Sequence, residues 1–307
     1  MMQINILKSM INSRHSLQAK FVGLMMFAIL FSSCTEEIDV NVDSGETRLS
    51  VEATLTSDLK KHFVKLKESS DVFYDQEAVA VENASISVSD GSTNYQFIET
   101  KPGYYESENE FAGEPGKTYS LSITNVDVNK DGELEEYLAS STMKQPYAVD
   151  SIRLHYDPEY ESEGRGDDDE EGEFWLVSLY MKDDIKTEDF YAFACRRNDI
   201  LVHDTITEVL VQKDTYFNGE TTKGVDVGEF DQAKPDEILR NNDKITLETY
   251  AIDEAYYDFV FQLQEMDEEQ SMFSGPPGNI STNISNGAIG FFAVYSITRT
   301  SIILETD

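Results

Sequence analysis

The stretch Ala84-Ser-Ile-Ser-Val-Ser-Asp-Gly-Ser-Thr-Asn-Tyr-Gln-Phe-Ile98 alternates apolar and polar residues on either side of the dipeptide Asp90-Gly91. Alternation over about 4–8 residues is typical of a half-buried β-strand. A glycine-containing turn between two such segments predicts a β-hairpin, because glycine readily adopts the positive φ that a tight turn needs. The stretch therefore predicts an antiparallel β fold.

Further alternating segments surround this hairpin at spacings of about 8–12 residues, which is typical of a small β-sandwich. They cover residues 47–56, 62–67, 118–124 and 137–143. We therefore expect an immunoglobulin- or transthyretin-like β-sandwich domain over residues 47–146. Pro146 and Asp150 mark its expected end, because both residue types are common where a chain turns.

The second half of the chain, residues 150–307, predicts a larger β-rich domain with one helix, so the fold class is mainly all-β. Its strand-like segments are residues 174–181, 189–195, 209–211, 244–250 and 291–297. Residues 253–266 carry apolar side chains at three- and four-residue steps behind Asp253, a good N-cap residue, and they predict a helix packed on the core. The block 159–173 is almost entirely acidic with glycines interspersed, which predicts a disordered loop.

Residues 1–33 have the pattern of a lipoprotein signal peptide. Their charged residues are all basic, and an apolar run over residues 21–31 precedes Ser32, Ser33 and Cys34. A basic start, about 7–15 apolar residues and small residues before the cleavage site mark a secretory signal, whereas a transmembrane helix needs about 20 apolar residues. The thiol in that position predicts acylation of Cys34. The alternative is an ordinary signal peptide followed by a chance cysteine.

Acidic residues follow Cys34 in a polar tether over residues 34–46. Glu36, Glu37 and Asp39 resemble the export mark of Bacteroidota lipoproteins that reach the outer face of the outer membrane. The alternative is a flexible acidic tether without signalling content. Acyl chains hold a protein on a membrane through about 0.8 kcal/mol per buried methylene. We therefore expect a lipid-anchored outer-membrane protein that faces the cell exterior.

The charge of the chain argues against one class of partner. With 59 acidic and 24 basic residues among 307, the net charge is −35. Such a charge repels a phosphate backbone, so we expect no nucleic-acid binding. Only Cys195 remains after the lipid cysteine, so no internal disulfide can form. Its apolar neighbours predict a buried small hydrophobic residue rather than a catalytic thiol.

Several motifs are distributed over nearly all of the mature chain. They are Arg48-Leu-Ser-Val-Glu-Ala53, Asp90-Gly91, Pro102-Gly-Tyr-Tyr105, Gly113-Glu-Pro-Gly-Lys-Thr-Tyr-Ser-Leu121 and the closing run 272–296. Together with the lipid cysteine and the tether, they resemble the Bacteroidota lipoprotein family known as domain of unknown function 4249. The resemblance implies an outer-membrane lipoprotein, often encoded near TonB-dependent transporters, and it supplies no established catalytic residues.

One local motif resembles the calcium loop of an EF-hand, with Gly132 at its sixth position. The candidate ligands are Asp127, Asn129, Asp131, Glu133 through its backbone carbonyl, and Glu135. Leu138 stands where an EF-hand carries a bidentate glutamate, and the flanking segments are strand-like. Asn, Asp and Gly are also common hairpin residues. We therefore favour a plain acidic hairpin over a calcium site, and calcium is the single cofactor that we consider.

The remaining sequence favours a binding role over catalysis. His62, His155 and His203 lack the spacing of a zinc site, and there is no Gly-x-Ser-x-Gly elbow or phosphate-binding loop. We expect a non-enzymatic accessory of a TonB-dependent nutrient transporter, acting in ligand capture or as a lid. One alternative is an extracellular hydrolase of a polymer or peptide, because paired carboxylates can meet in space. Another is a structural adhesin or envelope protein.

Overall fold

The computed structural model describes residues 47–69, 78–162, 170–182, 187–202, 205–206, 208–216, 219–267 and 280–305. These residues are mostly β-strand with a single α-helix, which confirms the expected mainly all-β class. Residues 45–307 form one compact unit. None of the described helices is both long enough and apolar enough to cross a membrane.

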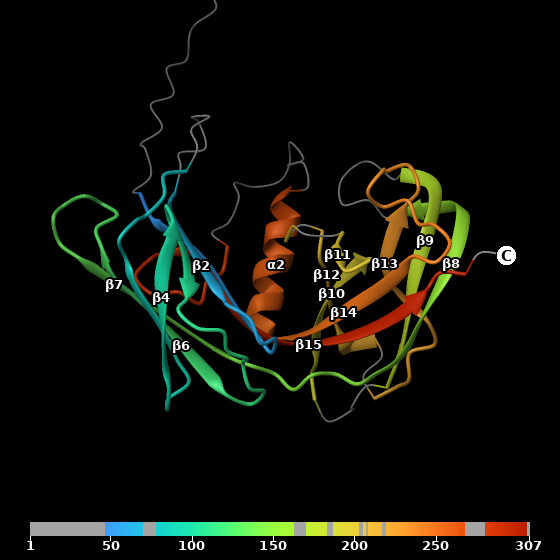
Figure 1. The fold of residues 1–307 in the computed structure, drawn as a ribbon, viewed down its shortest axis with the longest axis horizontal. Helices are drawn as coiled ribbons and strands as arrows, with labels where there is room; N and C mark the ends of the chain where they lie inside the picture. Colours follow the sequence, from blue (N-terminus) through green and yellow to red (C-terminus); the bar gives the residue numbers. More distant parts are fainter. Residues whose placement is uncertain are drawn as a thin grey trace, which may run out of the picture. The chain divides into compact units, whose positions relative to one another are not determined.

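The strands alternate along the chain with short turns and one helix (Figure 1). The first half contains β1 (Leu49–Thr56), β2 (Phe63–Glu68), β3 (Ser85–Ser89), β4 (Asn94–Lys101), β5 (Tyr104–Ser107), β6 (Thr118–Val126) and β7 (Glu135–Thr142). The second half contains β8 (Val149–Ser162), β9 (Glu170–Met181), β10 (Phe190–Arg197), β11 (Ile200–Leu201), β12 (Leu210–Lys213), the 3-10 turn η1 (Asp214–Tyr216), β13 (Val225–Asp231), β14 (Lys244–Ile252), α2 (Glu254–Asp267) and β15 (Ile289–Ile303).

The first half is built as the alternation predicts. Its strands hydrogen-bond in the order β1-β2-β5-β4-β3-β6-β7. Every second residue of β6 enters the core, where Tyr119, Leu121 and Ile123 are all at most 1% exposed. The Asp90-Gly91 hairpin joins β3 to β4, and Gly91 has a φ of 86°. Alternating burial on successive strands therefore creates one apolar core for this half.

The last strand, β15, connects the two halves of the chain. Its first part pairs in parallel with β1, from Ser50↔Ile289 to Thr56↔Tyr295. Its second part pairs antiparallel with β14. Phe292 and Val294 of β15 are buried in the core of the first half. The segments expected as separate domains over 47–146 and 150–307 thus share one twelve-stranded sheet within one compact unit.

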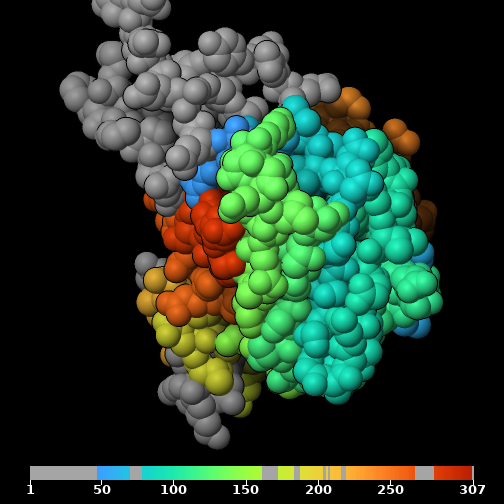
Figure 2. All heavy atoms as spheres, turned by 90° about the vertical axis from the view of Figure 1, so that its left-hand side faces the viewer, coloured from blue at the N-terminus to red at the C-terminus, as the bar shows by residue number. Residues whose placement is uncertain are grey.

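A second contact closes the first half from its other edge. Ile284 forms an isolated bridge with Ala139 of β7, and the Ser285 N–H donates to the Leu138 carbonyl at 2.8 Å. In Figure 2 the red C-terminal segment lies directly beside the green strands of the first half. Ile284, Ala288, Phe292 and Val294 of the closing run therefore belong to the first core.

The second half has three layers. The sheet β13-β9-β8 packs on one face of the strands β10, β14 and β15, and α2 packs on the other (Figure 1). Residues Ile245–Ile252 of β14 are buried, because both faces of the strand are covered. The helix agrees with the predicted range 253–266, and its stripe enters the core through Phe259 and Val260. Met266, at the end of the predicted range, is 41% exposed.

The acidic segment 159–173 differs from the expected disordered loop at both ends. Strand β8 continues to Ser162 and β9 begins at Glu170, with the register Tyr160↔Gly172 and Ser162↔Glu170. The backbone hydrogen bonds of an antiparallel pair do not depend on which side chains the strands carry. Pairing of β8 with β9 therefore extends into the acidic segment despite the repulsion between its like charges. The rest of the segment, residues 163–169, lies outside the described residues.

Candidate functional site

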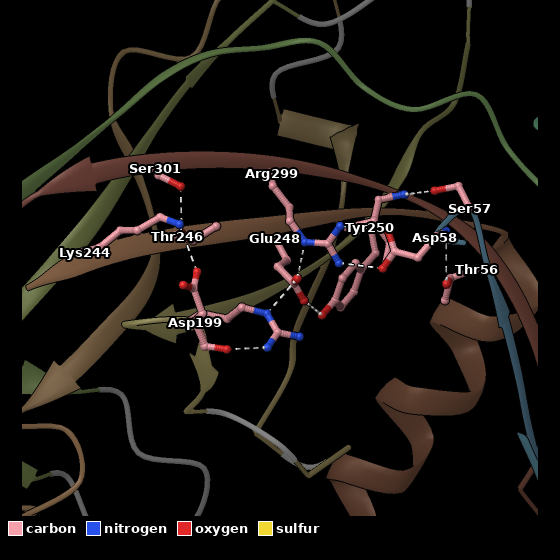
Figure 3. Close-up of polar contacts among 12 residues, drawn as sticks. Thr56, Ser57, Asp58, Asp199, Lys244, Thr246, Glu248, Tyr250, Arg299 and Ser301 are labelled. Carbon is pink, nitrogen blue, oxygen red and sulfur yellow. Dashed lines mark hydrogen bonds and ion pairs between the residues drawn. The ribbon is translucent and has the colours of Figure 1, made fainter. Parts of the chain in front are cut away.

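A group of charged side chains gathers on the face of the sheet that also carries α2. Strand register places Glu248 of β14 between Ala194 of β10 and Arg299 of β15. Side chains alternate between the faces of a strand, so Arg196 shares this face with Glu248 and Arg299. Figure 3 shows Glu248 and Arg299 pointing toward each other, with Asp58 reaching in from the loop after β1. We call Asp58, Lys60, Arg196, Glu248, Tyr250 and Arg299 the ionic cluster.

Glu248 is the centre of the ionic cluster and is 1% exposed. Its Oε1 accepts hydrogen bonds from Arg196 Nε at 2.8 Å and from Arg299 Nε at 2.6 Å. Its Oε2 accepts one from the Tyr250 hydroxyl at 2.6 Å. Arg299 also donates from both terminal nitrogens to Asp58, at 2.7 Å each (Figure 3). Such a two-pronged guanidinium–carboxylate pair is among the strongest polar contacts in proteins.

These contacts determine the charge state of the cluster. Burial acts to raise the pKa of Glu248, but the hydrogen bonds from Arg196, Tyr250 and Arg299 outweigh it and hold that pKa below its usual value. The Arg299 guanidinium lowers the pKa of Asp58 in the same way. Burial raises the pKa of the Tyr250 hydroxyl, so it remains a donor. At neutral pH, Glu248 and Asp58 are therefore ionised and act as hydrogen-bond acceptors.

Lys60 gives the cluster an exposed cationic edge. It belongs to the loop between β1 and β2 and is exposed. Partial burial lowers the pKa of its ammonium group, and attraction by Asp58 and Glu248 opposes that shift. The side chains of Arg196 and Arg299 are 29% and 40% exposed. Three cations therefore surround two carboxylates, one of which is buried. This edge presents positive charge to solvent on a chain whose net charge is −35.

A second polar group brings together a serine, a histidine and an aspartate on neighbouring strands β9, β8 and β13. The Ser178 hydroxyl donates to Asp226 Oδ1 at 2.7 Å, and its oxygen lies 3.2 Å from His155 Nδ1. His155 Nε2 is 3.9 Å from Asp226 Oδ2, which is beyond hydrogen-bond distance. A nucleophilic serine must give its proton to the histidine. Here that proton is directed at the aspartate, so the group is a serine-bridged pair.

The candidate calcium residues form the turn between β6 and β7. Asp127 accepts from the backbone N–H groups of Asp131 and Gly132, at 3.1 and 3.0 Å. Asp131 accepts from the N–H of Glu133 at 2.7 Å, and Glu135 accepts from the N–H of Val128 at 3.1 Å. These are hydrogen bonds of an acidic hairpin. Among the described residues, no group of three or more Asp, Glu, His or Cys is arranged to hold a metal ion. The preference for a plain acidic hairpin, with calcium as the alternative, remains a prediction.

The other predicted site residues lie outside the described part of the chain. Cys34 and the acidic residues Glu36, Glu37 and Asp39 precede residue 47. The structure therefore does not test lipidation or export. Cys195 is described and fully buried, as its apolar neighbours indicated.

No motif in the sequence predicts the ionic cluster. Its one local signal is Glu248 in the middle of the apolar segment Lys244-Ile-Thr-Leu-Glu-Thr-Tyr-Ala-Ile252. A buried carboxylate must find partners, because an unpaired buried charge costs several kcal/mol. Those partners are 52 and 51 residues away for Arg196 and Arg299. Spacing along the chain cannot identify them.

Comparison with known proteins shows the family of the chain. A family model described as a domain of unknown function, DUF4249, matches residues 35–301. The chain therefore belongs to that family, as its motifs indicated. No curated protein matches the sequence.

One solved structure is described as "a putative carbohydrate binding protein from Bacteroides uniformis ATCC 8492". It is 10% identical to this chain and covers 83% of it and 98% of its own length, with a TM-score of 0.21. At that TM-score the likeness carries no conclusion about fold or function.

Proposed function

We propose that this chain is a non-enzymatic binding lipoprotein on the outer face of the outer membrane, and that it serves a TonB-dependent nutrient transporter as an accessory. The leader ending at Cys34, the acidic residues after it and membership of the family support the location and the kind of partner. The ionic cluster supplies the contact surface, through the exposed cations beside Glu248.

The state of Glu248 is the observation that carries a binding role. A carboxylate with a lowered pKa carries no proton to donate near neutral pH. A carboxylate that already accepts hydrogen bonds from three donors also has little capacity to take up a proton. Its negative charge instead positions Arg196 and Arg299. With Lys60 these side chains form a preorganised cationic surface for an acidic partner or ligand.

Pull-down of the lipidated chain from outer membranes tests this proposal. We expect a TonB-dependent transporter to co-purify with the wild type. Reversal of two exposed charges by Lys60→Glu and Lys61→Glu should reduce its recovery, because an acidic partner face is then repelled. The matched control carries Lys213→Glu and Lys223→Glu, two exposed lysines elsewhere, and should recover as much transporter as the wild type.

The outcomes separate the parts of the proposal. Failure to recover any transporter with the wild type would exclude the transporter partnership. Equal loss in both double variants would mean that net charge, rather than the ionic cluster, governs the contact. Cys34→Ala should release the chain from the membrane, and a variant that still fractionates with outer membranes would contradict the lipid anchor.

A second candidate function, extracellular hydrolysis, is favoured by the proximity of Ser178, His155 and Asp226. A reaction with a fluorophosphonate probe tests it, because such probes label serines that a base has activated. Since the Ser178 proton is directed at Asp226, we expect no labelling. Labelling that Ser178→Ala removes would establish the hydrolase instead.

A further inference from the structure

A surface hollow opens at the end of the second half, between β8, β9 and the last residues of β15. Its volume is about 460 Å³, and its lining residues are Leu154, Trp175, Ile302, Ile303, Leu304 and Glu305. Figure 1 shows the C-terminal end of β15 reaching the side of β8. A volume of this size is typical of a site for a small organic molecule.

The hollow is separate from the ionic cluster. Ile302 belongs to the core between the two sheets, together with Val177 and Ile245, whereas Arg299 is on the opposite face of β15. Ile303 shares the face of Arg299 but lies four residues further along the strand, and the two sites have no residue in common. Loss of one does not imply loss of the other.

The wall formed by the end of β15 is held in place by the backbone. The Leu304 N–H donates to the Asp243 carbonyl at 2.9 Å, and the Asn242 N–H donates to the Leu304 carbonyl at 2.8 Å. Leu304 itself is 3% exposed, while Ile303 next to it is 48% exposed. The apolar wall is thus preformed, which lowers the entropic cost of binding a ligand there.

The Trp175 ring lines the hollow, and the Tyr156 ring packs beside it. Tyr156 of β8 pairs with Trp175 of β9, and their ring centroids are 5.4 Å apart at an angle of 48°. Tyr156 is 44% exposed and Trp175 is half-buried, so both rings are accessible at the rim. Aromatic faces carry negative potential and attract organic cations within about 6 Å.

Two carboxylates lie near these rings. Glu305 lines the hollow, and Glu173 is close enough to Tyr156 to raise the pKa of its hydroxyl. The chain around them has a net charge of −35, which raises the local concentration of cations and lowers that of anions. The hollow itself therefore combines an apolar wall, the Trp175 ring and the Glu305 carboxylate, and Tyr156 and Glu173 lie beside Trp175.

We propose that this hollow binds a small organic cation, with its ammonium group against Trp175, Tyr156 and the carboxylates and its apolar body against the wall of Ile302, Ile303 and Leu304. This site goes beyond the proposed accessory role, which makes no use of it. A neutral apolar ligand would use the wall alone, and an anionic ligand would be repelled by Glu173 and Glu305.

The experiment exploits the fact that Trp175 is the one tryptophan of the chain. Benzyltrimethylammonium, benzyl alcohol and phenylacetate share one ring and differ in charge. Each is titrated into the full-length chain at a single ionic strength, with calorimetry for affinity and Trp175 emission for location. We expect the cation to bind about tenfold more tightly than the alcohol, to change the emission, and to bind more tightly than the anion.

Variants then assign the contacts. Glu305→Gln and Glu173→Gln should each weaken the cation several-fold and leave benzyl alcohol unchanged, and Trp175→Leu should weaken it about tenfold by calorimetry. The matched control Glu133→Gln removes the same charge from the exposed turn between β6 and β7 and should have no effect. Unchanged melting temperatures verify that the variants are folded.

Three results would overturn the proposal. If Glu305→Gln and Glu133→Gln weaken cation binding equally, the contribution of Glu305 is only the general attraction of an acidic chain for cations. Equal affinity for benzyl alcohol and the cation would mean that the hollow binds the apolar ring and does not recognise the charge. Cation binding without any change in Trp175 emission would place the ligand elsewhere.

Discussion

At the scale of single residues, His62 is a buried histidine that no local motif predicts. It is 0% exposed and lies one residue before β2. Its Nε2 donates to the Phe111 carbonyl at 2.8 Å, and the two rings meet edge to face with centroids 4.6 Å apart. Its Nδ1 has no hydrogen-bond partner among the described residues.

His62 should make folding stability depend on pH. Burial is the main cause that lowers its pKa from 6.5 to about 4, while the hydrogen bond to Phe111 opposes the shift. The unfolded chain therefore binds the proton first, so the stability is present above pH 6.5 and is lost as pH falls toward 4. At about 1.4 kcal/mol for each pKa unit, the loss is about 3 kcal/mol.

Denaturant unfolding of the wild type and of His62→Gln at pH 7 and pH 4 measures this contribution. Glutamine keeps a donor for the Phe111 carbonyl but does not titrate. We expect the wild type to lose about 3 kcal/mol more than the variant over this interval. Equal losses in the two proteins would show that His62 titrates normally in the folded state.

Gly290 marks the place where β15 meets β1 most closely. Its φ is 93°, and a Cβ at this position would overlap the carbonyl oxygen of Val51, its partner in the register. Gly290→Ala should therefore lower the free energy of unfolding by roughly 2–5 kcal/mol, from backbone strain plus overpacking. The matched control is Gly91→Ala, whose φ is also positive but whose Cβ would meet open space. Similar losses in the two variants would exclude the overlap as a cause.

At the scale of elements, α2 begins as its sequence indicates, and it also ties the two halves together. The Tyr256 N–H donates to Asp253 Oδ1 at 2.9 Å, which is an N-cap contact. The Ser141 hydroxyl of β7 donates to Asp253 Oδ2 at 2.8 Å. One carboxylate therefore caps the helix and contacts a strand 112 residues away.

Replacement of Asp253 should lower the free energy of unfolding by more than the loss of an ordinary N-cap does. Asp253→Ala removes the cap and leaves the largely buried Ser141 hydroxyl without its acceptor, so we expect a loss of roughly 2 kcal/mol. A double-mutant cycle with Ser141→Ala separates the terms, and the coupling should be about 1 kcal/mol. Additive losses would mean that the contact across the two halves contributes nothing to stability.

The sheets show which elements local pattern predicts well. Alternation identified β6, and the Asp90-Gly91 dipeptide identified the β3–β4 hairpin, because both depend on neighbours within a few residues. The acidic block was less predictable. Its like charges repel one another, but backbone pairing with β9 extends β8 to Ser162.

At the scale of the whole molecule, the core of the first half depends on the end of the chain. Phe292 and Val294 of β15, with Ile284 and Ala288 before it, are buried in that core. Without these residues, one edge of β1 is unpaired and one side of the core of the first half is exposed. A fragment lacking these residues loses apolar burial of about 1.5–3 kcal/mol for each large side chain.

We therefore expect residues 47–146 alone to be unfolded. Circular dichroism and the proton NMR spectrum should show no cooperative melting and no dispersed amide signals. A synthetic peptide of residues 280–298, added in trans, should restore folded structure because it supplies the partner of β1. The control peptide carries the same residues in scrambled order. A fragment that melts cooperatively without any peptide would show that the first half is an independent domain.

The amino-acid sequence by itself determined the local features of this protein. It specified the mainly β class, the hairpin at Asp90-Gly91, the capped helix after Asp253 and the burial of Cys195, since each depends on residues close in the chain. Tertiary structure alone decided the parallel pairing of β15 with β1 and the partners of Glu248. Both join residues far apart in sequence, and such contacts depend on how all the strands pack rather than on any local period.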